Sequence, residues 1–325
     1  MTTIRDVAKL ADVSVATVSR VINDKGYVNK DTKNRVEAAI QALDYRPNDV
    51  ARSLFKGKSK MIALFVPDIK NPFFPELAWA VEDISNQHGY TFILCNTDNN
   101  NKKEITYLQA LSQKSIDGII LVSSTMSSTQ MKGIKVPMIA LDRKMESDLI
   151  SVTVNNREGA RQAVQYLKQT GCQRIAHIAG PETVSSAIHR LGGYVDEVKN
   201  DAWFTSHYIR AGDYSMDKAF EETKQLLEIE PDVDGIFVAN DVMGVGVLKA
   251  IKALNKRVPK DISVISFDGI ELGTITTPSL TTMAQPIYHI GKRAAEILIQ
   301  KIEHPKTKVQ SEEHEVTLTI RESTR

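Results

Sequence analysis

Hydrophobic residues recur every three or four positions through the first 43 residues, which is the spacing of amphipathic helices. The pattern predicts three helices, at residues 4–11, about 15–23 and about 31–43, whose apolar faces meet in one small core. The predicted inward residues are Ile4, Val7, Ala8, Ala11, Val18, Val21, Ile22, Val36, Ala39, Ile40 and Leu43. A turn at residues 12–13, followed by Ser14 as a favourable N-cap, gives helix-turn-helix spacing. Taken alone, the pattern also fits any three-helix bundle.

From residue 61 onward, short apolar runs alternate with helical patterns. The predicted strands are 61–66, 91–95, 118–122, 137–142, 174–179, 235–239 and 262–268. The predicted helices lie near 74–87, 105–113, 157–169 and 242–255. Such alternation predicts an α/β fold of parallel sheets covered by helices. Because one sheet with so many strands would be unusually wide, the pattern favours two doubly wound lobes.

Composition supports a globular protein with more than one domain. A chain of 325 residues, 25% charged and 42% hydrophobic, has room for two or three domains. No run approaches the roughly 18 apolar residues that a spanning helix needs, and the first ten residues carry charges where a secretion signal would be apolar. We therefore expect a cytoplasmic protein with no membrane partner. The two cysteines, Cys95 and Cys172, are expected to be reduced core residues.

The net charge of +1 conceals an asymmetry between the start of the chain and the rest. Residues 1–60 contain 12 Lys and Arg against 7 Asp and Glu, which leaves 29 against 33 for the remainder. A basic segment joined to a mildly acidic body is typical of a polyanion-binding module, although a solvated basic face is a commoner cause of such an excess.

Two stretches, TIRDVAKLADVSVATVSRVIN and YRPNDVARSL, resemble the DNA-binding head of the lactose/galactose-repressor family of bacterial transcription regulators. The resemblance covers about sixty residues in the family's order of helix, turn, recognition helix, third helix and hinge. It implies a helix-turn-helix head at 1–46, a hinge helix and linker at 47–60, and an effector-binding and dimerisation domain at 61–325. Asp12 stands where the family usually has glycine; because Asp tolerates a left-handed backbone, we expect a small stability cost and the same fold.

A recognition helix lies in the major groove with its early residues against base edges, which makes Val15, Ala16 and Arg20 the expected readers. Arg20 can pair bidentately with guanine, whereas Val15 and Ala16 offer apolar contact to thymine methyl groups. Thr17 and Ser19, which could equally be plain helix surface, are placed with other polar residues to contact phosphates. The full predicted DNA-binding set is Ser14, Val15, Ala16, Thr17, Ser19, Arg20, Asn23, Tyr27, Asn48, Ala51 and Leu54.

The segment 48–55 is too short to be a stable helix by itself. In the family, the matching segment becomes helical when it pairs with its dimer mate on DNA, and a leucine wedges into the minor groove; the resemblance assigns this role to Leu54. Ordering of the hinge is then a step that a ligand could switch. A head of this kind needs two half-sites, so we expect a homodimer on a pseudo-palindromic operator in double-stranded DNA.

The resemblance continues through the body and implies a periplasmic-binding-protein fold with a ligand cleft between two lobes. By this analogy the chain crosses between the lobes near Asn156, Gln285 and Glu313. Lobe 1 is then about 61–156 and 286–312, and lobe 2 about 157–285 and 313–325.

In open α/β sheets, ligands bind beyond the carboxyl ends of the strands, and the residues there are polar and aromatic. They are Asn71, Phe73, Phe74, Asp142, Arg143, Arg190, Tyr214, Asn240, Asp268 and Gln285. Carboxylates, guanidinium groups and amides each hold neighbouring hydroxyls at two points, and aromatic faces cover the C–H side of a sugar, so the set suits a small neutral polyol. Nine of the ten, all except Tyr214, match in order the pocket of ribose-binding members of the fold.

The amino-terminal half, including GYVNKDT, NDVARSLFK and DIKNPFFPELA, is also similar to ribose-operon repressors within the family, which implies D-ribose as the effector. Other interpretations of single residues remain. Phe73 or Phe74 could be core residues, Asp142 with Arg143 could be a structural ion pair, and Asp241 could cap the helix that follows it.

The leading hypothesis is therefore a repressor that leaves its operator when a sugar closes the lobes. A different sugar or a sugar phosphate could be the effector, and the family contains members whose effector promotes DNA binding. A second hypothesis is a catabolite-control regulator with a phosphorylated carrier protein as corepressor. Against it, Glu296 stands where such regulators are expected to carry an arginine for the phosphate.

No motif for catalysis or cofactor binding is found. The sequence lacks HExxH, GxSxG, a P-loop and Cys-pair metal motifs, so we expect neither an enzyme nor a bound cofactor or metal. The seven histidines are expected to be surface or core residues. A transport binding protein would need a secretion signal and would not carry the basic head.

Overall fold

The computed structural model describes residues 2–24, 26–45, 58–122, 126, 130–131, 133–143 and 149–325. The chain divides into two compact units, 1–59 and 60–325. The division falls at the end of the segment expected to be hinge and linker.

The described residues of the first unit form three helices, α1 (Ile4–Leu10), α2 (Val15–Ile22) and α3 (Lys30–Ala42). Val7, Val18 and Val36 are fully buried at its centre, as the spacing predicts. Ser14 caps α2, because its side chain accepts a hydrogen bond from the Thr17 amide at 3.1 Å. The predicted helices therefore form within one or two residues of the expected bounds.

Asp12 has φ +52°, in the left-handed region where glycine is most at ease. The departure from the family pattern is thus accommodated as expected, by an aspartate in a conformation that this residue tolerates.

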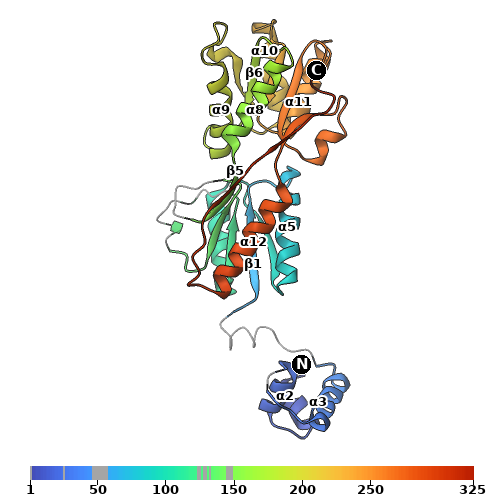
Figure 1. Cartoon of the computed structure of the whole chain (residues 1–325). Coiled ribbons are helices and arrows are strands. Elements are labelled where there is room, and N and C mark those ends of the chain that lie inside the picture. Colours follow the sequence, from blue (N-terminus) through green and yellow to red (C-terminus); the bar gives the residue numbers. More distant parts are fainter. Residues whose placement is uncertain are drawn as a thin grey trace. The chain divides into compact units, whose positions relative to one another are not determined.

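The second unit contains two six-stranded sheets, each with helices on both faces (Figure 1). The first sheet has the order β11-β5-β4-β3-β1-β2, with all neighbours parallel. Its strands are β1 (Met61–Val66), β2 (Thr91–Asn96), β3 (Gly118–Leu121), β4 (Met138–Leu141), β5 (Ser151–Val154) and β11 (Glu312–His314). Helices α5 (Phe73–Gln87) and α12 (Ile287–Glu303) cover one face, and α6 (Asn101–Gln113) covers the other.

The second sheet has the order β12-β10-β9-β8-β6-β7 and is parallel except for the β10–β12 pair. Its strands are β6 (Ile175–Ala179), β7 (Ile209–Ala211), β8 (Gly235–Val238), β9 (Ser263–Asp268), β10 (Thr281–Ala284) and β12 (Thr317–Thr319). The helices are α8 (Asn156–Gln169), α9 (Ser185–Val198), α10 (Met216–Ile229) and α11 (Asp241–Ala253). Helices α8 and α9 pack against one face, and α10 and α11 against the other. Two doubly wound lobes are therefore confirmed.

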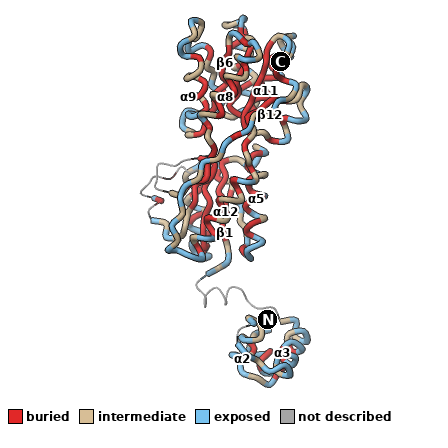
Figure 2. The backbone as a smooth tube through the Cα atoms, in the orientation of Figure 1, coloured by how far each residue is buried: buried red, intermediate tan, exposed pale blue. Residues whose placement is uncertain are grey.

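The inner strands form the buried centre of each lobe, while the outer helix faces are exposed (Figure 2). Cys95 and Cys172 are both buried and free, as expected. Burial raises the pKa of the Cys95 thiol to about 11, so this thiol stays protonated.

The chain passes between the lobes three times, after β5, after β10 and after β11. The first two passages lie near Asn156 and Gln285. Glu313, however, lies inside β11 and pairs with Thr153 in the first sheet, so the third passage begins after His314.

Candidate functional site

All ten predicted ligand residues line one cavity between the two lobes of the second unit. Ser186 is the eleventh residue that lines this cavity. The empty volume of the cavity is about 270 Å³.

The residues meet because the parallel strands of each lobe end at the same edge of their sheet. Asn71 lies between β1 and α5, and Asp142 directly follows β4. In the second lobe, Asn240 lies between β8 and α11, and Asp268 is the last residue of β9. Gln285 follows β10. Seven separate segments of the chain thus contribute to one site.

Two aromatic rings form part of the first lobe's wall. Phe73 and Phe74 make an edge-to-face contact, with ring centroids 5.3 Å apart and an interplanar angle of 87°. The side chain of Asn71 accepts a hydrogen bond from the Phe73 amide at 3.1 Å, which fixes the entry into α5. Both phenylalanines belong to the apolar core and also line the cavity. They are therefore both core residues and candidate ligand contacts.

Arg190 is the most constrained residue of the site. From α9, its Nη1 donates to the Ala239 carbonyl at 2.6 Å and to Asp268 Oδ1 at 3.1 Å, and its Nε donates to Asn156 Oδ1 at 2.8 Å. The guanidinium group also lies 3.8 Å from the centre of the Phe267 ring. A buried cation held at four points is oriented before any ligand arrives, which reduces the cost of binding.

The carboxylates of the cavity are strongly influenced by burial. Burial raises the pKa of Asp268; Arg190 opposes this rise, while the nearby carboxylates of Asp241 and Asp142 add to it. Burial also raises the pKa of Asp142, although Arg143 and Arg190 both act in the opposite direction. In each case the loss of hydration outweighs the neighbouring guanidinium groups.

Three buried polar atoms of the cavity have no hydrogen-bond partner among the described residues. They are Asp142 Oδ1, Arg143 Nε and Gln285 Oε1. Arg143 Nε lies 3.4 Å from Asp142 Oδ2, so the two side chains form a loose ion pair. A purely structural pair would use its donors and acceptors more fully, because an unpaired buried polar group is costly.

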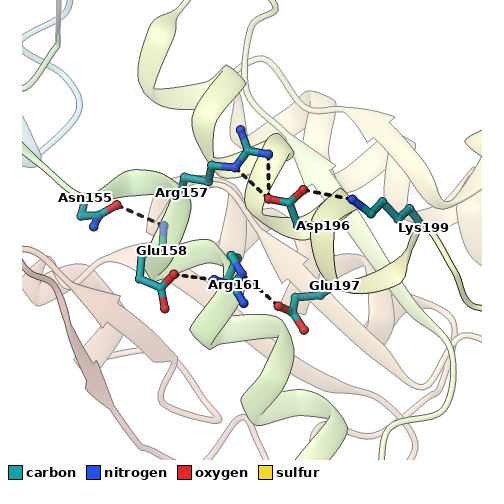
Figure 3. A pocket seen from close by; sticks show the side chains of 7 residues that line it. All are labelled: Asn155, Arg157, Glu158, Arg161, Asp196, Glu197 and Lys199. Atoms are coloured by element: carbon teal, nitrogen blue, oxygen red, sulfur yellow. Dashed lines mark hydrogen bonds and ion pairs between the residues drawn. The ribbon is translucent and has the colours of Figure 1, made fainter.

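A larger cavity, with an empty volume of about 710 Å³, lies between α8 and α9 and contains none of the predicted residues (Figure 3). It is lined by paired charges: Arg157 with Asp196 at 2.7 Å, and Arg161 with Glu158 at 2.9 Å and with Glu197 at 3.0 Å. Because these groups already neutralise one another, this cavity is an ion-pair network that joins two helices and is a weaker candidate for a ligand site.

On the first unit, the three predicted base readers lie on α2 and are partly or fully exposed. Val15 is 41% exposed although it is a large apolar residue, and Ala16 and Arg20 are also exposed. Tyr27 is 93% exposed. Exposed apolar and aromatic side chains beside a basic residue provide a surface that DNA could cover.

Several polar residues of the predicted DNA-binding set form hydrogen bonds within the first unit. The Ser14 and Thr17 hydroxyls lie 2.9 Å apart, and the Asn23 amide donates to the Ser19 carbonyl at 2.7 Å. Thr17, Ser19 and Asn23 are therefore half-buried helix-end residues as well as candidate phosphate contacts. Asn48, Ala51 and Leu54 lie outside the described residues.

Sequence reasoning missed Ser186 and Asn156. Ser186 precedes Arg190 by four residues on α9, so it occupies the same helix face, and this spacing could have revealed it. Asn156 acts through its bond to Arg190, which only the fold brings within reach.

Among the described residues, no three His, Cys, Asp or Glu side chains form a group suited to a metal ion. No helix in this part of the chain is long and apolar enough to cross a membrane.

Comparison with known families gives two matches. Residues 3–48 match the model described as "Bacterial regulatory proteins, lacI family", and residues 164–324 match that of a periplasmic binding protein-like domain. The chain is 46% identical to the ribose operon repressor of Halalkalibacterium halodurans, over 100% of this chain and 98% of that protein. It is 40% identical to the ribose operon repressor of Bacillus subtilis, over 92% and 91% of the respective chains.

Solved structures give the same picture. The Lac repressor dimer bound to operator and the anti-inducer ONPF is similar with a TM-score of 0.89, at 28% identity and 99% coverage of both chains. A LacI family transcriptional regulator from Enterococcus faecium with bound ribose is similar with a TM-score of 0.73, at 28% identity, over 81% of this chain and 98% of that chain.

Proposed function

The chain belongs to the LacI family of bacterial regulatory proteins, and we therefore propose that it is a DNA-binding transcriptional repressor of a ribose operon. Like the rest of its family it is a regulator and not an enzyme. In this proposal D-ribose is the effector, and its binding between the lobes of the second unit releases the operator.

The observation that carries the proposal is the convergence of all ten predicted ligand residues on one small cavity. Residues scattered over more than 200 positions of sequence would not meet by chance with three aromatic rings, two guanidinium groups and three amide side chains around one space. Such a set holds vicinal hydroxyls at two points each and covers the apolar face of a sugar ring.

The charge of the site favours a neutral sugar over a sugar phosphate. The cavity presents the carboxyls of Asp142 and Asp268 beside the guanidinium groups of Arg143 and Arg190. A phosphate bound at the guanidinium groups would lie against these carboxyls and raise their pKa further, at a cost in affinity. The ribose operon repressors among its relatives and the ribose-bound neighbour support the same choice.

The first unit supplies the DNA-binding function. We place Val15, Ala16 and Arg20 against base edges, with the hinge residue Leu54 as a wedge in the minor groove. Two copies would be needed to contact two half-sites, in keeping with the operator-bound dimer of the Lac repressor. Because the operator is DNA, the compartment in which this protein works is the bacterial cytoplasm.

The carrier-protein alternative meets an obstacle on α12. Glu296 forms ion pairs with Arg293, and with Lys292 at 3.8 Å. A phosphorylated partner would therefore find a carboxylate where a free cation would be needed, and it would have to displace existing pairs.

A thermal-shift titration of the purified protein tests the effector. D-ribose is compared with other pentoses, hexoses and ribose phosphates, because a ligand that binds only the native state raises the unfolding midpoint, and above the dissociation constant the rise grows with the logarithm of the ligand concentration. We expect such a rise with D-ribose, equivalent to about 2.7 kcal/mol at 100 times the dissociation constant. A rise with another sugar or a phosphate alone would reject ribose, and no rise with any compound would favour the carrier-protein alternative.

Two variants show whether the binding occurs in this cavity. Arg190→Ala should abolish the shift while leaving operator binding intact, because the guanidinium group faces the cavity. Arg161→Ala, which removes the same type of side chain from the charged cavity between α8 and α9, should keep the full shift. Loss of operator binding in Arg190→Ala as well would assign this residue a folding role.

A further inference from the structure

Three segments that carry cavity residues meet at a fully buried carboxylate outside the cavity. Asp241 is the first residue of α11 and directly follows Asn240. Its side chain contacts the loop after Asp268 and the strand that leads to Gln285. Asp241 itself does not line the cavity.

Both oxygens of Asp241 are fully used as hydrogen-bond acceptors. Oδ2 accepts from the backbone amides of Gly269 and Ile270, each at 2.8 Å. Oδ1 accepts from the Thr282 hydroxyl at 2.8 Å and from the Ser266 hydroxyl. Four donors match the capacity of an ionised carboxylate, so the bonds favour the charged form and oppose the effect of burial, which raises the pKa of Asp241.

The loop that Asp241 holds has an unusual backbone. Asp268 has φ +111°, a region that residues other than glycine rarely adopt, and Gly269 follows with φ +82°. A Cβ at Gly269 would lie 2.6 Å from the Cβ of Ala284, so the loop also lies close against β10. A strained conformation persists only where the surroundings impose it. Here the hydrogen bonds from the two backbone amides to Asp241 impose it.

This conformation directs the Asp268 carboxylate to its partners. Oδ1 of Asp268 accepts from Arg190 Nη1 at 3.1 Å and from Gln285 Nε2 at 2.8 Å. If the loop relaxed to an ordinary backbone conformation, the carboxylate would turn away from these two donors. The geometry of the cavity on this side therefore depends on the loop.

Helix capping does not account for Asp241. Asn240 already caps α11, because its Oδ1 accepts from the Met243 amide at 2.9 Å. The bonds of Asp241 go instead to β9, to the loop that follows it and to β10. Its charge at the amino end of a 13-residue helix is favourable, which helps the carboxylate to remain ionised when buried.

We propose that Asp241 is a positioning residue for sugar binding, which holds the loop at residues 268–270 so that Asp268 faces the ligand. This inference rests on the proposed function, since the ligand in question is the sugar effector. Asp241 acts only through Asp268 and the loop, and it makes no contact with the sugar.

The first test needs no ligand. In the full-length protein, Asp241→Ala should accelerate hydrogen exchange of the Gly269 and Ile270 amides at least tenfold, because both lose their acceptor. Val264→Ala is the matched control, since it destabilises the same strand, β9, from a buried site in the apolar core. It should lower the unfolding midpoint without selective exchange at the two amides.

The second test measures D-ribose affinity by calorimetry. Asp241→Ala should weaken binding at least tenfold, whereas Val264→Ala should not. In a protein that already carries Asp268→Ala, the Asp241→Ala change should cause little further loss, because its effect passes through Asp268. If the two changes weaken binding independently, Asp241 does not act through Asp268 and the proposal is wrong.

Asp241→Asn provides a variant of the same shape that keeps the proposal testable if the alanine variant does not fold. The groups that face Asp268 are Arg190 from α9, Asp241 from α11, Asp142 after β4 and Gln285 after β10. Because the Asp241 charge raises the pKa of Asp268, its removal should shift the midpoint of the pH dependence of ribose binding to lower pH. An unchanged midpoint would mean that Asp241 does not influence Asp268, which would contradict the proposal.

The outcomes separate the inference from the function on which it rests. If wild-type protein binds no sugar but the two amides exchange faster in Asp241→Ala, the effector assignment is wrong. The result would still support the role of Asp241 in fixing the loop at residues 268–270. If wild-type protein binds ribose and the Asp241 variants bind it equally well, the function stands and the positioning role is rejected.

Discussion

At the scale of single residues, His177 shows how a histidine can be confined to one protonation state. Its ring is stacked between Phe237 and Tyr194, at centroid distances of 4.7 and 5.1 Å. The pKa of His177 is lowered to about 4, chiefly by burial; the bond to the Phe237 carbonyl acts against this, and the positive charge of Arg190 adds to the lowering. The neutral ring donates from Nδ1 to that carbonyl at 3.0 Å. Among the seven histidines, this one is a core residue, as the sequence suggests for some of them.

His177 should make the protein sensitive to acid. The unfolded chain has a histidine pKa near 6.5 and the folded chain one of about 4, so the unfolded state binds more protons between these values. Its contribution to stability is full above pH 6.5 and is lost as the pH falls through this window, by about 3 kcal/mol in total. The His177→Phe variant keeps a stacked ring but loses the titrating group. We therefore expect its free energy of unfolding, measured by urea denaturation, to change less with pH between pH 4 and 7. An unchanged slope would assign the acid sensitivity to other groups.

At the scale of elements, the sequence predicts best what local spacing controls. The three helices of the first unit and the strands next to Asn71, Asp142, Asn240 and Asp268 could be placed, because periodicity and chain order define them. Strand β5 was not predicted: its Ser-Val-Thr-Val alternation is typical of a half-exposed strand, yet Ser151 and Thr153 are buried. A central parallel strand is covered on both faces, and sequence alone does not show that cover.

The same limit applies to the candidate site. The rule that ligands lie beyond strand ends identified ten lining residues. It did not identify Ser186, which also lines the cavity, or Asn156, which accepts a hydrogen bond from Arg190. A helix cap was one interpretation of Asp241 from the sequence, since a carboxylate at a helix start often has that role. Its bonds to Gly269, Ile270 and Thr282 join segments 28 to 41 residues away, and only the folded sheet brings them together.

Helix α2 depends on its cap, because eight residues are too few to form a stable helix alone. Ser14→Ala removes the side-chain acceptor of the Thr17 amide and should destabilise the first unit by about 1 kcal/mol. Hydrogen exchange of the α2 amides in full-length protein without DNA measures this loss. Ser14→Asp keeps an acceptor and should restore protection, while Ser19→Ala, on the same helix, should have a smaller effect. Equal effects of the two alanine changes would show that the cap is unimportant.

At the scale of the whole molecule, the proposed sugar cavity and the proposed DNA-binding helix α2 belong to different units, so regulation requires a coupling free energy between them. Helix α12 begins two residues after Gln285 and ends at Glu303. Glu303 pairs with Lys60, the first residue of the second unit, at 3.2 Å, and the Lys60 amide donates to Asp117 at 2.7 Å. One helix thus connects a cavity segment to the residue at which the second unit begins.

This arrangement leads to a prediction about reciprocity. If D-ribose weakens operator binding by a certain factor, the operator must weaken ribose binding by the same factor, typically about 5- to 150-fold, because both report one coupling free energy. Glu303→Gln breaks the ion pair at the far end of α12 and should leave ribose affinity without DNA unchanged while reducing this factor. Glu296→Gln is the matched control on the same helix, since its pairs with Arg293 and Lys292 do not involve Lys60, and it should keep the wild-type factor. Calorimetry with and without operator, together with DNA-binding titrations with and without ribose, gives the factor from both directions. If Glu303→Gln keeps the full factor in both titrations, the Lys60–Glu303 pair has no part in the coupling, and the signal must leave the second unit by another route.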